Sequence, residues 1–234
     1  MLLKKDEVRF LIVRHGESLG NAAQTLLGHT DMDLSELGYA QARETCKYIL
    51  ENYTVDEVRS SDLQRAWHTV EEIAAHFRVA LQKERELREI MIGKWENMRI
   101  SEVDEQYHDD FTVWKTDFGR CCPTGGESPA MLRERISKEM WRIARENMAI
   151  SANGETGRTV CIGSHGAAIR MLISEVRKTS LEDVREIPWA ANASITELIY
   201  RANGRIEEVR YGYNAFMPET LAPEIAADGI SKKV

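Results

Sequence analysis

Two histidines follow apolar runs that are typical of buried strands, and a glycine comes directly after each of them. His15 follows the run 8–13 after Arg14, and His165 follows the run 159–163. The glycines allow the chain to turn sharply and a ligand to approach the backbone. Because ligands of open α/β sheets bind at the carboxyl ends of strands, we expect both imidazoles to lie beside one binding site.

Two arginines can add positive charge to this site. Arg14 precedes His15, and Arg65 lies in the first turn of a predicted helix that follows a short strand at 57–59. A lone arginine there is ordinarily a solvated surface residue, and its charge opposes the helix dipole by roughly 0.3–1 kcal/mol. An anion bound beside the helix N-terminus would reverse that penalty, and the guanidinium fork suits phosphate oxygens. The residues together predict a cationic pocket for a phosphoryl group.

His15 is a competent nucleophile towards phosphorus. Neutral imidazole has a free lone pair near pH 7, and neighbouring arginines favour the neutral form. Covalent capture would split one displacement into two easier steps, with the arginines stabilising the charge on the phosphoryl oxygens. The leaving alkoxide then needs an acid and the attacking water a base, and one carboxyl group can serve as both. A structural core histidine is the alternative, but the neighbouring Arg14 and the second pair at His165 favour chemistry.

Apolar patterns predict strands that alternate with helices. The predicted strands are 8–13, 57–59, 79–81, 159–163, 194–200 and 205–211. The predicted helices are 35 to about 51, about 63–77, about 127–150 and 166 to about 176. This order predicts a three-layer α/β/α sandwich with a mostly parallel sheet. Asn203 and Gly204 predict a hairpin that adds an antiparallel edge strand, and Ser61 to Gln64 has the pattern of a capping box.

The remaining segments complete a single predicted domain over 1–234. Residues from about 84 to 126 are expected to form a partly helical insertion over the active site. Its Trp95 and Trp114 are expected to pack in the core or a lid, with a pocket wall as the alternative. The segment from about 215 to 234 is expected to be a flexible tail.

Composition limits the partners of the protein. The net charge of −7 argues against nucleic acid and anionic membranes as partners. Four cysteines without a CxxC pair argue against structural zinc and favour reduced thiols in a cytoplasmic protein. The sequence leaves a homodimer open, because the edge of the terminal hairpin could pair with a second chain.

Further motifs extend the pattern around the two histidines. They are Arg14-His15-Gly16-Glu17-Ser18 with Asn21, Leu34 to Gly38 with Gln41-Ala42, Ser60 to Ala66, Leu87-Arg88-Glu89 with Gly93, Trp95 and Glu96, Gly126-Glu127-Ser128, and Ser164 to Arg170. In this order and spacing they resemble the histidine phosphatase superfamily, also called phosphoglycerate mutase-like, over about residues 8–200. Asn97 stands where many relatives have glycine.

The resemblance implies a role for each matching residue. His15 would be the phosphorylated nucleophile, and Glu89 the general acid that later activates water. The implied phosphate-binding set is Arg14, Asn21, Arg65 and His165. Without the resemblance, Glu89 among other charged residues would be read as a solvated side chain. The resemblance also implies a small phosphorylated substrate and no metal or cofactor.

Three functions are compatible with these residues. A phosphomonoester hydrolase is favoured, because family mutases carry extra basic residues after the acid, including an adjacent arginine pair. Between Glu89 and Glu127 the chain has only Lys94, Arg99, Lys115 and Arg120. A phosphoglycerate mutase is the first alternative. A phosphate-binding scaffold without turnover is the second, and it is disfavoured because all five catalytic positions are intact.

Overall fold

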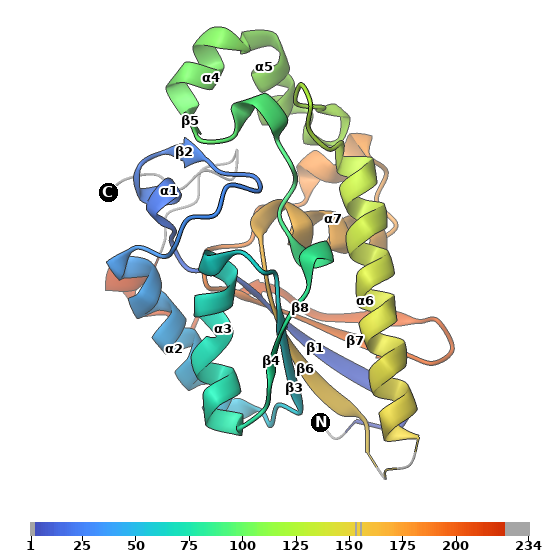
Figure 1. Cartoon of the computed structure of the whole chain (residues 1–234). Coiled ribbons are helices and arrows are strands. Elements are labelled where there is room, and N and C mark those ends of the chain that lie inside the picture. The colour runs from blue at the N-terminus through green and yellow to red at the C-terminus, as the bar shows by residue number, and fades with distance from the viewer. Residues whose placement is uncertain (1–2, 153, 155, 223–234) are drawn as a thin grey trace.

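The computed structural model describes residues 3–152, 154 and 156–222 (Figure 1). The strands are β1 (Glu7–Arg14), β2 (Thr25–Leu26), β3 (Glu57–Ser60), β4 (Leu81–Lys83), β5 (Met98–Arg99), β6 (Arg158–Ser164), β7 (Ile195–Arg201) and β8 (Ile206–Tyr213). The α-helices are α1 (Leu19–Ala22), α2 (Glu36–Asn52), α3 (Gln64–Phe77), α4 (Ile100–Gln106), α5 (His108–Thr116), α6 (Pro129–Ser151) and α7 (Gly166–Val176). The 3₁₀ helices are η1 (Arg85–Leu87), η2 (Gly93–Trp95), η3 (Phe118–Arg120), η4 (Glu182–Glu186) and η5 (Glu219–Leu221).

Six strands form the main sheet, in the order β4-β3-β6-β1-β7-β8. The strands β4, β3, β6 and β1 are parallel, whereas β7 runs antiparallel to β1 and β8 antiparallel to β7. In this register Arg14 pairs with Ser164, so β1 and β6 end at the same level. The predicted mostly parallel sheet with an antiparallel hairpin at its edge is therefore confirmed, and Gly204 in the hairpin turn has a φ of +85°.

Both faces of the sheet are buried, which explains why β1 is apolar throughout. Val8, Phe10 and Ile12 belong to the hydrophobic core that includes residues of α6 and α7. Leu11 and Val13 point to the opposite face, where α2 and α3 pack. Successive side chains of a strand point to opposite faces, so β1 contributes to two cores. Figure 1 shows these helix pairs on the two sides of the sheet, as the predicted three layers require.

Two helices begin where short polar side chains cap them. The Ser35 hydroxyl accepts a hydrogen bond from the backbone N–H of Gly38 at the start of α2 (3.0 Å). The Ser128 hydroxyl accepts one from Met131 at the start of α6 (3.3 Å), and Pro129 takes the first helical position, where no N–H is needed.

The predicted capping box at Ser61 to Gln64 is wrong. The helix α3 begins two residues later than the pattern requires, with Leu63 at the N-cap and no side-chain cap from it. Its first backbone N–H, that of Gln64, donates to the Asp31 carboxylate (2.8 Å), which also accepts from the Gln64 side chain (3.1 Å). The cap comes from a residue distant in sequence, which a local pattern could not predict.

The segment between β4 and α6 is partly helical, as predicted. It contains η1, η2, β5, α4, α5 and η3, and β5 pairs with β2 in a second, two-stranded sheet. In Figure 1 this insertion, which includes α4 and α5, lies beyond the end of the main sheet where α1 and β2 also lie. The Trp95 ring is fully buried, with ring contacts to Phe111 and Trp114, so it packs within the insertion.

The first part of the predicted flexible tail is packed against α2. Phe216 stacks on Tyr48 with ring centroids 4.5 Å apart, and the Leu221 carbonyl accepts from Gln41 (2.9 Å). Residues 223–234 of the predicted tail lie outside the described residues. Within the described part of the chain, no helix combines the length and the apolar character that crossing a bilayer would require.

Candidate active site

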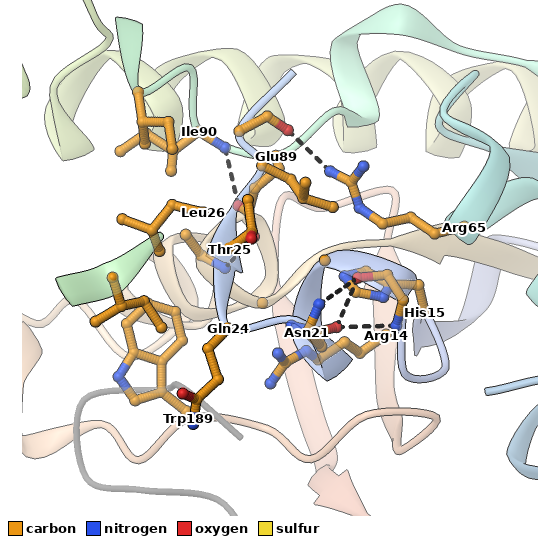
Figure 2. Close-up of a pocket in the computed structure, with 18 of the residues that line it drawn as sticks. Arg14, His15, Asn21, Gln24, Thr25, Leu26, Arg65, Glu89, Ile90 and Trp189 are labelled. Atoms are coloured by element: carbon orange, nitrogen blue, oxygen red, sulfur yellow. Dashed lines mark hydrogen bonds between the residues drawn. The ribbon is translucent and has the colours of Figure 1, made fainter. Parts of the chain in front are cut away.

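The carboxyl ends of β1, β3 and β6 bring the sequence-predicted residues together. The backbone N–H of His15 donates to the Ser164 carbonyl (3.0 Å), which joins the two strand ends. The rings of His15 and His165 lie 5.3 Å apart between centroids. Arg14, His15, Asn21, Arg65 and Glu89 line one pocket (Figure 2). The predicted convergence of two imidazoles and two guanidiniums is therefore present in the structure.

The imidazole of His15 is held in one orientation. Its Nδ1 lies 2.6 Å from the Gly16 carbonyl, which can only accept, so Nδ1 carries the proton. The lone pair is then on Nε2, and the ring lines the pocket. Burial, followed by the charges of Arg65 and Arg14, lowers the pKa of His15 well below its usual 6.5. The ring is thus neutral at physiological pH and able to act as a nucleophile.

Gly16 has a packing role that differs from the expected sharp turn. A Cβ at this position would lie 2.4 Å from the Gly38 carbonyl oxygen, so only glycine fits against the start of α2. Gly166 likewise has little room, because its Cβ would lie 3.2 Å from the Arg14 guanidinium carbon. Both glycines therefore allow close packing around the two histidines.

The two arginines are buried and remain cationic. Burial lowers the pKa of Arg65 to about 10, which leaves it charged at neutral pH. Its guanidinium donates to the carbonyls of Thr30 (2.9 Å) and Gly28 (2.8 Å), and three further N–H groups remain available. The expected anion at the start of α3 is the chain's own Asp31, so a ligand would be held by the side chain of Arg65 rather than by the helix end.

Three nitrogens beside His15 are buried without a hydrogen-bond partner among the described residues. They are Nε of Arg14 and both ring nitrogens of His165. The other end of Arg14 is anchored, since Nη1 donates to the Ala190 carbonyl (2.5 Å). Burial, followed by the charge of Arg65, lowers the pKa of His165 well below 6.5. Unsatisfied buried polar groups are costly, and a bound oxyanion would accept hydrogen bonds from Nε of Arg14 and from the one N–H of the neutral His165 ring.

Glu89 lies at the N-terminus of α7. Its two carboxylate oxygens accept hydrogen bonds from the backbone N–H groups of Ala167 and Ala168, each at 3.1 Å, and Oε1 also accepts from Ile90 (2.8 Å). The carboxylate is therefore fixed beside the residue that follows His165, and Glu89 lines the pocket. Asn21 accepts from the backbone and hydroxyl of Ser18 through Oδ1, which leaves its Nδ2 group to donate to a ligand.

No three or more histidine, cysteine, aspartate or glutamate side chains in the described ranges are grouped as a metal ion would require. The chemistry at hand is that of an imidazole nucleophile, two guanidiniums and one carboxyl group around a space that an oxyanion can fill.

The sequence that forms this site matches the model of a known protein family. The model of the histidine phosphatase superfamily (branch 1) matches residues 10–212, which is most of the chain. The chain belongs to this superfamily. The predicted family is therefore confirmed.

Individual relatives agree with this assignment. The chain is 28% identical to phosphoglycerate mutase-like protein 4 of Arabidopsis thaliana, over 81% of this chain and 78% of the relative. It is 30% identical to phosphoserine phosphatase 1 of Hydrogenobacter thermophilus, over 70% of this chain and 74% of the relative. The structure of Bacillus stearothermophilus YhfR has the same fold, with a TM-score of 0.82 at 22% identity, over 90% of this chain and 100% of that one.

Several residues that support this histidine phosphatase site were not predicted to do so. Arg135 of α6 donates to the backbone carbonyls of Glu86, Arg88 and Glu89 (2.7–3.1 Å) and forms a bidentate ion pair with Glu127. His29, which lies outside the motifs that the sequence analysis singled out, hydrogen-bonds through Nε2 to the Glu89 carbonyl (2.9 Å). Glu127 belongs to the motif Gly126-Glu127-Ser128, to which the sequence analysis assigned no role. This motif was the one feature of the sequence that pointed to a supporting residue.

The backbone after His15 has its own supports. Asn192 donates to the carbonyl of His15 (2.9 Å), and the Thr69 hydroxyl accepts from the backbone N–H of Gly16 (3.0 Å). The same hydroxyl donates to the Arg65 carbonyl (2.6 Å), so one side chain links the histidine loop to α3. Neither residue stood out in the sequence, because such contacts join elements that are distant along the chain.

Proposed function

We propose that this protein is a phosphatase that hydrolyses a phosphomonoester through a phosphohistidine on His15. One observation supports it most: nitrogens of Arg14 and His165 that have no partner among the described residues are buried beside the His15 imidazole and close to Arg65. A phosphoryl group can accept hydrogen bonds from Nε of Arg14, from the guanidinium of Arg65 and from the one N–H of the neutral His165 ring. The relatives named as phosphatases agree with this function.

The first step transfers the phosphoryl group to the enzyme. Nε2 of His15 attacks phosphorus, the bond from phosphorus to the ester oxygen breaks, and Glu89 donates a proton to the departing oxygen. Arg14, Arg65 and His165 stabilise the negative charge on the phosphoryl oxygens, and Asn21 adds a hydrogen bond from Nδ2.

The second step returns the enzyme to its starting state. Glu89 takes a proton from a water molecule, the water oxygen attacks phosphorus, and the phosphorus–nitrogen bond to His15 breaks. Inorganic phosphate leaves, and Glu89 regains the proton it gave in the first step. His15 is the nucleophile in the first step and the leaving group in the second, Glu89 carries the proton in both, and both side chains line the pocket.

Hydrolysis is favoured over mutase activity by the charges in the pocket. Among the described residues that line it, the only arginines are Arg14 and Arg65, and lysine is absent. Both arginines are placed at the transferred phosphoryl group, so none is left for the carboxylate or second phosphate of a bisphosphoglycerate. The mutase remains an outcome that the assay below can detect.

We further propose that the substrate is a small phosphorylated compound in the cytoplasm. The pocket has a volume of about 100 Å³, which suits a small molecule better than a folded phosphoprotein. The four cysteines are free thiols, three of them buried, which agrees with a reducing compartment. A homodimer stays a prediction.

The test is hydrolysis of p-nitrophenyl phosphate in the presence of EDTA. We expect the wild-type protein to hydrolyse this substrate. His15→Ala should lose activity on the order of 10⁴-fold, because the nucleophile is gone. His76→Ala, at an exposed histidine in the last turn of α3, is the matched control and should retain activity. Full activity of His15→Ala would refute the nucleophile, and phosphoglycerate interconversion faster than phosphate release would favour the mutase.

A further inference from the structure

The pocket has two chemically different ends. The neutral imidazole of His15 and the charged side chains of Arg14, Arg65 and Glu89 lie at the end where the strands terminate. The other end is lined by large apolar side chains: Leu26, Ile90, Ile92, Ile100, Trp114 and Trp189. Figure 2 shows this separation, with His15 and Arg65 at the right and Leu26, Ile90 and Trp189 at the left.

The apolar end carries no charged side chain among the described residues that line the pocket. Its polar groups include the uncharged side chains of Gln24 and Thr25, from the turn before β2 and from β2 itself, and the indole N–H of Trp114, which is buried without a partner among the described residues. A carboxylate or ammonium placed there would lose its water without gaining an ion pair, which is strongly unfavourable. An uncharged apolar group would instead be stabilised by burial.

The side chains that form the aromatic wall of this end are held by contacts with one another and with the backbone. The Arg170 guanidinium lies over the Trp189 ring, 4.5 Å from its centroid, and its Nε donates to the Ile187 carbonyl (2.8 Å). On the insertion side, the Phe118 ring contacts Trp189 and Trp114 edge to face, with ring centroids 5.2 Å and 4.9 Å away. These contacts join α7, the loop after η4 and the insertion into one packed wall. Binding against it would therefore require little ordering of side chains.

We propose that the alcohol part of the substrate is uncharged and largely apolar, an aryl or arylalkyl group that binds against Trp114, Trp189 and Ile100. This proposal rests on the phosphatase function proposed above and adds the substrate class. It differs from a phosphoserine substrate, whose alcohol part carries a carboxylate and an ammonium group. Here such charges would face isoleucine and tryptophan side chains.

Binding of non-hydrolysable phosphonates tests this proposal without requiring turnover. We would measure Kd by calorimetry for butylphosphonate, 4-phenylbutylphosphonate and 4-carboxybutylphosphonate. The three share the phosphonate and the alkyl chain and differ at the far end. We expect the phenyl compound to bind at least tenfold more tightly than butylphosphonate, and the carboxylate compound more weakly than butylphosphonate.

A charge introduced into the apolar end should change this order. Ile100→Lys, at the start of α4, should reduce the preference for the phenyl compound at least fivefold and improve binding of the carboxylate compound. Val113→Lys is the matched control, because Val113 belongs to α5 of the same insertion, is partly exposed and does not line the pocket. It should leave all three affinities unchanged.

The outcomes separate this proposal from the phosphatase function. Equal affinities in the wild-type series, or tightest binding of the carboxylate compound, would overturn the apolar substrate class while leaving hydrolysis through His15 intact. An effect of Val113→Lys on the three affinities equal to that of Ile100→Lys would also overturn the apolar substrate class and leave hydrolysis through His15 intact. Failure of all three phosphonates and of inorganic phosphate to bind would overturn the substrate class and the phosphoryl site together. The wild-type series decides the question even if Ile100→Lys does not fold.

Discussion

The imidazoles of His15 and His165 occupy surroundings that oppose their protonation. Both rings are buried, and the charge of Arg65 acts on each of them. Two neutral imidazoles and two cationic guanidiniums are compatible in one pocket, whereas four cations would repel one another. A bound phosphoryl group would relieve the remaining repulsion between the arginines.

A loss of stability in mild acid follows from this arrangement. In the unfolded chain both histidines take up protons as the pH falls through about 6.5, but the folded protein keeps them neutral because their pKa values lie well lower. Below about pH 6.5 the unfolded state therefore binds more protons, and the free energy of unfolding should decrease as pH falls. The slope is at most about 1.4 kcal/mol per pH unit for each histidine, and above pH 6.5 neither contributes.

Urea unfolding between pH 7.5 and 5.5 measures this effect. His165→Gln removes one of the two groups, so the pH dependence of its unfolding free energy should be shallower than that of the wild-type protein. An identical pH dependence in the two proteins would show that His165 is protonated in the folded state or does not contribute.

At the level of single residues, the sequence predicted which residues belong to the site better than it predicted their contacts. His15 and His165 could be predicted because each directly follows a strand end, and Arg65 because it lies in the first turn of a helix; both are local signals. Asn97 was notable only as a departure from glycine. In the structure it has a φ of +63°, a left-handed conformation that asparagine tolerates, and this preserves the turn between η2 and β5.

At the element scale, α6 positions the segment that carries Glu89. Arg135 spans that segment through hydrogen bonds to three of its carbonyls, and Glu127 accepts from the Met91 N–H (3.3 Å) on the other side of Glu89. In the proposed mechanism Arg135 would act on the reaction through Glu89, which would make it a positioning residue.

Replacement of Arg135 should reduce the efficiency of proton transfer. We expect Arg135→Met to lower kcat about 10- to 100-fold for an alkyl phosphate with a smaller change in KM, because the Glu89 carboxyl would lose its position. The loss should be smaller for p-nitrophenyl phosphate, whose leaving group needs little protonation.

Arg133→Met is the matched control on the same helix. Arg133 donates to the Thr179 carbonyl (3.2 Å), and it does not line the pocket. Equal losses for alkyl and aryl substrates, or an equal loss in Arg133→Met, would argue that Arg135 serves stability alone.

Element boundaries that depend on distant residues could not be predicted from the sequence. Asp31 caps α3 from another loop, and Phe216 packs on Tyr48 although its surroundings in sequence suggested a loose tail. The strands β1, β3 and β6 and the terminal hairpin, in contrast, follow from alternating or continuous apolar residues and from Asn203 and Gly204, whereas β2 and β5 were not predicted and β4 begins two residues after the predicted strand. Local patterns determine these elements, whereas the caps and the pocket wall depend on the completed fold.

At the scale of the whole molecule, β1 joins two hydrophobic cores and delivers His15 to the pocket. Phe10 faces the core of α6 and α7 and meets Tyr200 edge to face at 5.1 Å, while Leu11 faces the core of α2 and α3. Because both faces are covered, both side chains are fully buried.

Truncation on either face of β1 should therefore be similarly destabilising. We expect Phe10→Ala and Leu11→Ala each to lower the free energy of unfolding by about 3 kcal/mol, because each removes buried apolar atoms and leaves a cavity. Val209→Ala, at an exposed position of β8, should change it by less than about 0.5 kcal/mol. Chemical denaturation measures all three, and a near-neutral effect of either core variant would contradict the three-layer arrangement.

In the proposed mechanism His15 carries the phosphoryl group during turnover. Rapid quenching of the wild-type protein with a phosphomonoester, followed by peptide mass spectrometry under alkaline conditions that preserve phosphohistidine, tests it directly. We predict a phosphorylated imidazole at His15, absent from His15→Ala and unaffected in His76→Ala. Phosphorylation of a different residue, or steady turnover with no phosphorylated histidine at any quench time, would contradict the account.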